Sequence, residues 1–536
     1  MSFIDHYQNT MREEYSGCYA NSELNPELLI TLLSSIMGGY LSRVHGGVID
    51  FSFLLRPFFN LYVYIYANGS ALEPLKKAVL DKQFVFGNIN KLSEVEFNGY
   101  VHQLVYGLSQ ADDPQAYVAS ILTSEFTARP PLKVDMLREV LDNKWESKKS
   151  QVGISLSFTA IEQIALKCQL GGSIRFVKIE KHKSDPEVDL AARLAMLDSF
   201  SEHVDVKRLC EKEYRLLLSS VLFLPTYFLE QFDHCYLRAQ QHADGLKALI
   251  CGIEFQHKPI QAVLLAILKN RGVPLVGSQH GGFYGQTDAT WLEQTERSVF
   301  DHYITWGYRY NENDHPLPSV RLSRKRLPAP LSHVKRLISP IKRKSILVVL
   351  PHIMPTLAYS IQSPGVMRQQ QALYRSLAML DLLADAGYEV TLRAHPRNPI
   401  QDYEAAIPDR LKDSADLCNG KNSRLIEAMR QFEWVFFTNP NATGLSECVA
   451  NGVEFRIIAD SRDYEIRAEA AQVYHSLQLK NVWFTEKVQL KHLHKESGQK
   501  ARTEAIEEFV CMYGLHSKKY LRVWADYIKT LNKIGL

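Results

Sequence analysis

A glycine-rich turn carries residues that can bind an anion or move a proton. It comprises SQHGGFYG at 278–285 and directly follows VPLVG at 273–277. Glycines let backbone N–H groups approach a ligand, and successive N–H groups can form a nest for an anion. Histidine can donate to a phosphate oxygen or transfer a proton near neutral pH. We predict ligand binding by Gln279, Gly281 and Gly282 and a catalytic role for His280; the alternative is a tight turn around a buried histidine.

A second cluster combines positive charge with a proline. The run YEVTL at 388–392 leads into RAHPR at 393–397. A proline ends a strand and fixes the turn that follows, and arginine and histidine suit a phosphate or a carboxylate. We predict an anion-binding loop made of Arg393, His395, Pro396 and Arg397; the alternative is an ordinary polar loop.

A third cluster, TNPNATGLSE at 438–447, runs from a predicted strand through small residues into a helix. Free N–H groups at a helix N-terminus bind anions. The hydroxyl of Thr443 or Ser446 could add a further hydrogen bond to the anion, and the Glu447 carboxylate could accept a hydrogen bond from a ribose hydroxyl. The alternative, compatible with a ligand, is a helix cap by Asn441 or Thr443, worth about 1 kcal/mol. The predicted binding residues are Asn441, Thr443, Gly444, Ser446 and Glu447.

Weaker candidates lie elsewhere on the chain. Glu254 and His257 follow the apolar run 247–252 and could supply a general base, although a capping loop explains them equally well. Asp233, Asp288 and the segment 360–365 are comparable unknowns.

The elements that must position these clusters follow an alternation of strand and helix. Strands are predicted at 173–181, 247–252, 273–282 and 302–307, and again at 345–351, 388–397, 433–441, 453–460 and 480–484. Helices are predicted between them, at 258–272, 365–387, 423–431 and 442–452. Ligands of parallel sheets bind at the carboxyl ends of the strands. The clusters stand at these ends.

This rhythm predicts an α/β protein with two facing doubly wound, Rossmann-like domains. We place a helical N-terminal region at 1–150, the first Rossmann-like domain at 151–315 and the second at 346–498, with a C-terminal helix at 499–536. Residues 316–345 form a proline-rich linker with nine Lys and Arg and no acidic residue, so the rest of the chain sums to −6. A solvated linker is one reading, and attraction to anionic lipid or to a diphosphate-linked acceptor is the other.

Composition excludes several classes of protein. The 536 residues are 46% hydrophobic and 23% charged, which is ordinary for globular proteins. A net charge of +3 argues against a dedicated nucleic-acid-binding protein. The eight cysteines form no CxxC motif, and no P-loop, dinucleotide-binding, nucleophile-elbow, HExxH or metal-cluster pattern occurs. Without a signal-peptide pattern or a clean apolar stretch of about 18 residues, we predict a soluble, cytoplasmic protein.

The motifs QHGG at 279–282, RAHPR at 393–397 and NATGLSE at 441–447 resemble those of bacterial surface-polysaccharide glycosyltransferases of O-antigen and capsule gene clusters, over about residues 240–460. The resemblance implies the two-domain GT-B architecture, with the acceptor on the first domain and the nucleotide sugar on the second. By resemblance to enzymes with a His-Pro motif, His395 and Pro396 lie at the nucleotide phosphate, often that of a CMP-sugar, with Thr443 and Ser446 beside them. Gln279 and His280 would face them. The N-terminal block departs from the sialyltransferase pattern, because it contains no clear acidic D/E-D/E-G motif, and this leaves the base and the donor sugar open.

The leading hypothesis is therefore a metal-independent glycosyltransferase without a tightly bound cofactor. Its donor would be a nucleotide sugar, with a CMP-linked ulosonic acid such as Kdo or a sialic-acid relative as the favoured donor. Its acceptor would be a cell-surface glycan or a lipid-linked glycan. The hypothesis also includes peripheral contact of the protein with the anionic inner membrane. Two alternatives remain open: a nucleotide-sugar epimerase or glycerol-phosphate transferase of the same fold, and a non-catalytic scaffold in polysaccharide assembly.

Overall fold

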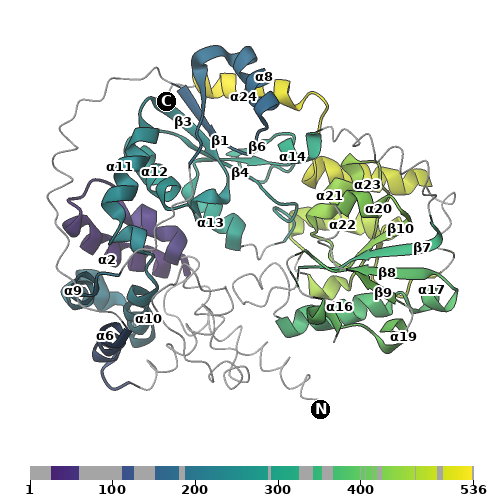
Figure 1. Ribbon diagram of the computed structural model, residues 1–536, viewed down its shortest axis with the longest axis horizontal. Coiled ribbons are helices and arrows are strands. Elements are labelled where there is room, and N and C mark those ends of the chain that lie inside the picture. The colour runs from purple at the N-terminus through teal and green to yellow at the C-terminus, as the bar shows by residue number, and fades with distance from the viewer. Residues whose placement is uncertain are drawn as a thin grey trace.

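The computed structural model describes residues 26–59, 111–125, 151–179, 188–256, 258–287, 291–324, 342–352, 366–396, 398, 400–404, 406–412, 415–418, 425–464, 466–489, 491 and 499–533. Figure 1 shows these residues as two α/β units, one built on each of two sheets. The predicted α/β fold with two Rossmann-like domains is confirmed.

The first sheet has six parallel strands in the order β2-β1-β3-β4-β5-β6. Their bounds are β1 Gln151–Ser155, β2 Ile174–Phe176, β3 Leu246–Cys251, β4 Leu275–Ser278, β5 His302–Thr305 and β6 Asp314–Pro316. The helices that follow or precede these strands are α8 Ala160–Leu170, α11 Phe232–Ala243, α12 Pro259–Asn270, α13 Trp291–Val299 and α14 Val320–Ser323. The strand order changes direction between β1 and β3. A switch point of this kind opens a crevice at the carboxyl ends of the strands.

The second sheet also has six parallel strands, in the order β12-β11-β10-β7-β8-β9. Its strands are β7 Lys342–Val349, β8 Glu389–Arg393, β9 Ala415–Cys418, β10 Phe432–Phe437, β11 Arg456–Ile458 and β12 Trp483–Phe484. Its helices are α16 Val366–Ala378, α17 Asp381–Asp385, α18 Gln401–Glu404, α19 Asp409–Lys412, α20 Leu425–Met429, α21 Thr443–Ala450 and α22 Ala468–Leu479. If β7 to β12 are renumbered 1 to 6, the strand order is the 3-2-1-4-5-6 of dinucleotide-binding folds. The switch point of this sheet lies between β7 and β10.

All nine predicted strands are present, most of them shorter than predicted. Sequence reasoning missed β1, β6 and β9. The run QVGIS of β1 contains a glycine and polar residues, β6 includes Pro316, and β9 has four residues. β6 and β9 are edge strands, where a proline is tolerated and pairing needs little apolar sequence.

The first domain carries a group of helices outside the strand–helix alternation of its sheet. Three of them precede β1, α2 Pro26–Val44, a helix at 51–59 and α6 Pro114–Glu125, and two lie between β2 and β3, α9 Leu190–Phe200 and α10 Glu211–Phe223. Their buried side chains, such as Leu33, Phe51 and Leu217, form one continuous core with those of α11 and α12. Among the described residues, no helix has both the length and the apolar character needed to cross a bilayer.

The C-terminal segment consists of two helices and joins both domains. α23 Gln499–Tyr513 packs on α21 and α22, whereas α24 Tyr520–Lys533 returns to pack on α8 and β1. Between them, Leu515 donates its N–H to Trp306 O over 2.8 Å and accepts from Ser319 N over 2.8 Å. Of the range 316–345 assigned to the linker, residues 316–324 belong to β6, α14 and their surroundings, residues 342–345 to β7, and residues 325–341 lie outside the described part.

Candidate functional site

The turn after β4 touches the start of α21, so the carboxyl ends of β4 and β10 meet. Gly282 N donates to Thr443 Oγ1 over 2.9 Å. A Cβ atom at Gly282 would lie 2.7 Å from Thr443 Cα and 3.2 Å from Thr443 N. Since the atoms in the way belong to backbone, only glycine allows this approach. The first and third sequence clusters are therefore brought together.

Residues after this turn extend the contact with the second domain. Gln286 O accepts from Arg467 N over 3.0 Å, and Thr287 forms an antiparallel bridge with Ile466. The Gln286 amide also accepts a hydrogen bond from Tyr474, whose hydroxyl is 3.1 Å from Asn441 Oδ1. Backbone and side chains together thus hold the two edges in one arrangement.

Gln279 shapes the turn from inside. Its side chain is buried, its Oε1 accepts from Trp306 N over 2.7 Å, and its Nε2 donates to Gly281 O over 2.7 Å. Because both ends of the amide are engaged within the first domain, we reassign Gln279 from ligand binding to support of the turn. Gly281 and Gly282 supply the backbone of the same turn.

His280 stands at the mouth of a buried acidic network. Its ring is 37% exposed, and its Nδ1 lies 2.8 Å from Tyr284 Oη and 3.3 Å from Glu296 Oε1. Glu296 is fully buried and accepts hydrogen bonds from Tyr284 and, over 2.7 Å, from Tyr303. With the Tyr284 proton donated to Glu296, its oxygen is left to accept from His280 Nδ1–H. This arrangement leaves the lone pair on Nε2 of the neutral imidazole, as a general base requires.

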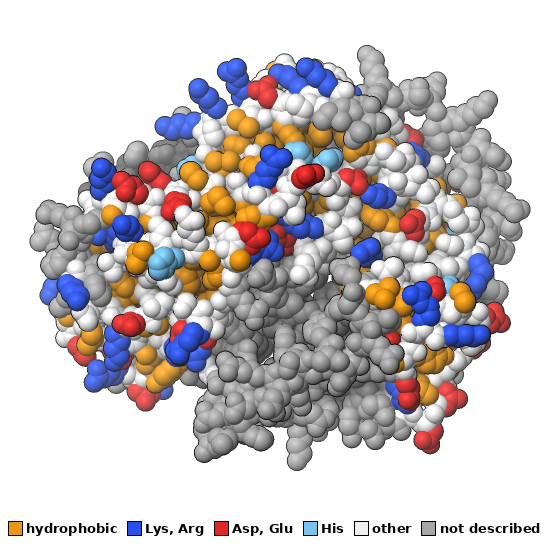
Figure 2. Space-filling model, turned by 180° about the vertical axis from the view of Figure 1, so that it is seen from behind, with side chains coloured by type: hydrophobic (Ala, Val, Ile, Leu, Met, Phe, Trp, Pro, Cys, Tyr) orange, Lys and Arg blue, Asp and Glu red, His pale blue; other side chains and the backbone are white. Residues whose placement is uncertain are grey.

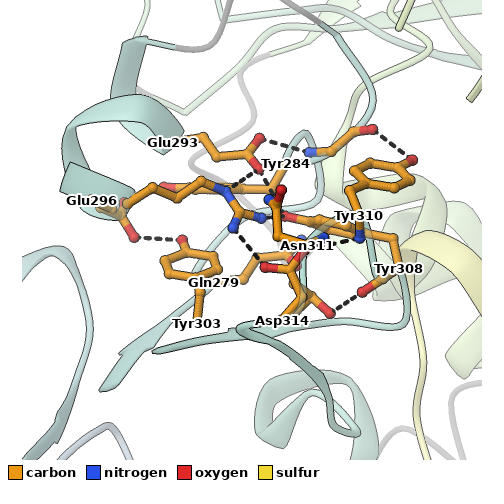
Figure 3. A network of polar contacts seen from close by, with 12 residues as sticks. Gln279, Tyr284, Glu293, Glu296, Tyr303, Tyr308, Tyr310, Asn311 and Asp314 are labelled. Carbon is orange, nitrogen blue, oxygen red and sulfur yellow. Dashed lines mark hydrogen bonds and ion pairs between the residues drawn. The ribbon is translucent and has the colours of Figure 1, made fainter. Parts of the chain in front are cut away.

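The tyrosines of this network remain proton donors. Burial, followed by the charge of Glu296, raises the pKa of both Tyr284 and Tyr303 well above its usual value. Figure 3 shows the neighbouring carboxylates in the same network. There, Arg297 donates to Glu293 Oε1 over 2.9 Å and to Asp314 Oδ1 over 2.6 Å. Arg297 therefore serves two other carboxylates, whereas His280, with its Nδ1 3.3 Å from Glu296 Oε1, can bring positive charge to Glu296.

Sequence reasoning missed Glu296 and Tyr284. Both could have been suspected from their spacing, because Tyr284 is four residues after His280 and Glu296 lies in the second turn of α13, which begins at Trp291 shortly after the cluster ends at Gly285. Acidic residues on a short helix with polar neighbours usually face water, so the pattern favoured an exposed position.

Glu254 lies beside the switch point of the first sheet, directly after β3. Its Oε2 is buried and has no hydrogen-bond partner. A Cβ atom at Gly252 would lie 2.8 Å from this oxygen. Burial, followed by the charge of Glu254, raises the pKa of the Cys251 thiol. Glu254 thus remains a candidate base, whereas His257 lies outside the described residues.

At the end of β8, His395 is held by its backbone. Its N–H donates to Tyr403 Oη over 3.1 Å, and Tyr403 donates to Pro351 O over 2.8 Å. The His395 ring stacks on the ring of His352, which follows β7, with centroids 4.4 Å apart. Arg393 is buried, and burial lowers the pKa of its guanidinium. Pro396 is exposed, and Arg397 lies outside the described residues.

His352 was also missed by sequence reasoning. It follows the predicted strand 345–351 within LPH, so its place at a strand end was a usable signal. β7 and β8 are neighbours in the sheet, and their carboxyl ends bring the two histidines together.

α21 begins without a side-chain cap. Its N-cap residue is Ala442, which forms no side-chain hydrogen bond, so neither Asn441 nor Thr443 acts as the predicted cap. Asn441 is 4% exposed, and its Nδ2 is buried without a hydrogen-bond partner. Gly444 brings the helix start onto β10, because a Cβ atom there would lie 2.7 Å from the Phe437 ring. The uncapped N-terminus and the Asn441 amide are donors that suit an anion.

Residues 116–528 match the family described as LIC12162 family transferase. The chain belongs to this family. No curated protein matches the chain by sequence.

Solved structures similar to this family member include a UDP-GlcNAc 2-epimerase from Neisseria meningitidis bound to UDP-GlcNAc, with 10% identity and a TM-score of 0.39, covering 72% of this chain and 100% of the other. Another is MurG from Acinetobacter baumannii, with 9% identity and a TM-score of 0.32, covering 72% of this chain and 100% of the other.

Two predicted ligand residues of this LIC12162-family chain are engaged elsewhere. Ser446 is 1% exposed, and its Oγ donates to Tyr513 O over 3.4 Å at the end of α23. Glu447 accepts from Arg321 of α14, with Nε at 3.0 Å and Nη2 at 2.6 Å from its Oε1. Both side chains tie α21 to other elements, so we withdraw them from the predicted ligand set.

The remaining candidates add little to the site. Asp233 Oδ1 lies 3.6 Å from Nδ1 of the buried His45, among the helices of the first domain. Asp288 and the segment 360–365 lie outside the described residues. Within the part of the chain that the structure describes, no three His, Cys, Asp or Glu side chains form a group suited to a metal ion.

Proposed function

We propose that this transferase-family chain is a glycosyltransferase that uses a nucleotide sugar and acts on a glycan or lipid-linked acceptor. The proposal rests on a contact between two sites of opposite character: a candidate base on the first domain and a candidate anion-binding helix start on the second. The carboxylate-backed His280 lies on the turn whose Gly282 touches Thr443, and Thr443 opens the uncapped helix α21. The candidate base His280 and Gly282, the residue that contacts the start of α21, therefore belong to one short turn.

The second domain supplies the donor site in this proposal. The phosphate of the donor would lie at the switch point between β7 and β10, where the N-terminus of α21 and the unpartnered Asn441 Nδ2 offer hydrogen bonds. His395 and His352 stand at the ends of β8 and β7 on the same edge. As the sugar–phosphate bond breaks, negative charge builds on the leaving phosphate. Fixed N–H donors and histidines stabilise that charge without a metal ion.

The first domain supplies the base. His280 Nε2 takes the proton of the acceptor hydroxyl, and Glu296 stabilises the imidazolium that forms. Because Glu296 is buried and hydrogen-bonded by two tyrosines, it holds the ring in place before the acceptor arrives. Glu254, after the neighbouring strand β3, is the second candidate for this role.

The finer proposal is a CMP-activated ulosonic acid as the donor, such as Kdo or a sialic-acid relative, with a surface-polysaccharide acceptor. Its support is the His-Pro sequence at 395–396, placed at a strand end beside a second histidine. A CMP-sugar has a single phosphate, for which one helix start and a small group of donors are sufficient.

Two measurements test the proposal. Thermal unfolding with CMP, CDP, UDP and GDP identifies the nucleotide, because a ligand that binds only the folded state raises its stability. Mass spectrometry after incubation with a panel of nucleotide sugars detects hydrolysis of the donor. We expect a shift with CMP and release of CMP from its sugar. No response to any nucleotide would favour the scaffold, and interconversion of the sugar without its release would favour an epimerase.

A further inference from the structure

Helix α8 exposes apolar side chains on its outer face. Ile161 is 80% exposed and Ile164 is 61% exposed, whereas Glu162 and Leu166 point inward. Residues three apart lie on the same side of a helix, and the exposed Cys168 continues that side one turn further. Large aliphatic side chains gathered on one helix face, unlike single ones scattered over a surface, mark a place of contact.

The helix that packs beside this face is basic. α24 contacts α8 and β1, and Tyr520 donates to Glu162. Residues 518–533 carry one acidic residue, Asp526, and five basic ones: Lys518, Lys519, Arg522, Lys529 and Lys533. Figure 2 shows Lys and Arg side chains gathered along the upper rim of the molecule, the region of α24 in Figure 1. The acidic residue of α8, Glu162, is itself paired with Arg324 over 2.8 Å.

This α8–α24 face, defined as Ile161, Ile164, Lys519, Arg522 and Val523, lies beside the switch point of the first sheet. α8 follows β1, and the last residue of β1, Ser155, pairs with Cys251 of β3. Glu254 comes three residues after Cys251. Helices that follow parallel strands begin at the carboxyl edge, so the two isoleucines in the first turns of α8 lie on the edge that carries both candidate bases, Glu254 and His280.

We propose that the α8–α24 face docks on an anionic lipid surface. The isoleucines would insert among the headgroups, while the lysines and arginine lie against the lipid phosphates. The surplus of basic residues over 518–533 complements such a surface, and it would repel a second copy of the same face. A second consequence rests on the proposed function: docking by this face would bring a lipid-linked acceptor to the edge of the sheet that carries the base.

Sedimentation with vesicles tests the docking directly. The protein is mixed with vesicles of phosphatidylcholine alone and with vesicles that contain phosphatidylglycerol, at low and high salt. We expect binding to the anionic vesicles, weakened by salt. The double substitution Ile161→Ser/Ile164→Ser should weaken it about tenfold or more through lost apolar burial. Lys519→Glu/Arg522→Glu should weaken vesicle binding about 30-fold or more, because each basic residue near an anionic surface contributes roughly a factor of five to the binding constant.

Matched controls remove similar groups from other surfaces. Val204→Ser/Leu479→Ser replaces two side chains that are 73% and 65% exposed, and Lys207→Glu/Arg208→Glu reverses two charges away from α24. Both controls should bind vesicles like the unaltered protein. The proposal would be overturned if Ile161→Ser/Ile164→Ser bound vesicles as well as its control, Val204→Ser/Leu479→Ser. Dimerisation lost with the isoleucines would overturn it as well and assign the face to a second copy.

Donor hydrolysis in the absence of vesicles separates this proposal from the proposed function. None of the substituted residues belongs to the site described above, so all four variants should hydrolyse a water-soluble donor at the unaltered rate. Loss of vesicle binding with unchanged hydrolysis supports the docking face. Vesicle binding without hydrolysis of any nucleotide sugar would support the docking face and contradict the glycosyltransferase.

Discussion

The carboxyl edges of the two sheets differ in the charge they carry and in how it is held. On the first edge, negative charge is buried: Glu293 and Glu296 are each 1% exposed or less. On the second edge, the groups are donors and cations: the uncapped start of α21, Arg393 and the stacked His352 and His395. The turn with Gly282 joins the two.

This difference separates two tasks of a group transfer. A base gains a positive charge when it takes a proton, so a buried carboxylate behind it is an advantage. A leaving phosphate gains negative charge, so N–H donors and cations in front of it are an advantage. The two sheets also differ in strand order. The switch point lies between β1 and β3 in the first sheet and between β7 and β10 in the second.

The sharpest test of the second edge is His395→Ala. We expect it to abolish measurable transfer, a loss of about 10³-fold or more, because a donor at the leaving phosphate is gone. Nucleotide-induced stabilisation should weaken too, while the melting temperature of the free protein stays the same. His475→Ala, on the exposed side of α22, is the matched control. Near-normal transfer by His395→Ala would remove the His-Pro loop from the site.

The corresponding change on the first edge is His280→Ala. Loss of a general base should lower kcat by about 10²- to 10⁴-fold. Nucleotide-induced stabilisation should persist, in contrast to His395→Ala, and this contrast would separate the two edges experimentally. If His280→Ala stays active and Glu254→Gln does not, the base is Glu254.

Glu296→Gln tests whether the buried carboxylate positions His280. We expect kcat to fall by about ten- to a hundredfold, as for other groups that orient a reacting histidine, with KM nearly unchanged. The pH dependence of kcat should also change, because the imidazolium loses its carboxylate partner. An unchanged pH profile with a lower melting temperature would show that Glu296 only stabilises the fold.

The contact between the edges can be loosened by Gly282→Ala. The added Cβ would lie 2.7 Å from Thr443 Cα, closer than Cβ atoms approach backbone, so the turn and the start of α21 must move apart. We expect a loss of about 1–3 kcal/mol in the free energy of unfolding, measured by denaturant titration, and slower transfer. Gly172→Ala has no atom within 4 Å of the new Cβ and should change little. Equal behaviour of the two variants would mean that the edges are free to move apart.

The smallest effect concerns the anchoring of α24. Burial by itself would raise the pKa of Glu162, but hydrogen bonds from Arg324 and Tyr520 outweigh it, so the pKa lies below its usual value. A carboxyl group with a lowered pKa stabilises the fold above the pKa of the unfolded chain and loses this contribution as the pH falls through its folded value. Glu162→Gln should therefore cost about 1–3 kcal/mol at neutral pH. The cost should shrink below about pH 4. Denaturant titrations at pH 7 and pH 3.5 measure it, and an equal cost at both would contradict the ion pair.

The sequence by itself determined nine of the twelve described strands and the positions of the three clusters at strand ends. These features depend on local patterns: apolar runs of strand length, glycine in a tight turn, and proline after a strand. For this reason local patterns alone were enough to place His280, His395 and the start of α21 at strand ends.

Only the tertiary structure decided what the polar side chains contact. Glu447 is 126 positions from its partner Arg321, and Ser446 is 67 positions from Tyr513. Glu296 of α13 is buried behind His280. Gln279 turned inward to support its own turn. Side chains of one type are equally able to bind a ligand or a distant part of the chain. The choice between them depends on which elements the fold brings within hydrogen-bond distance, and the local sequence does not encode that distance.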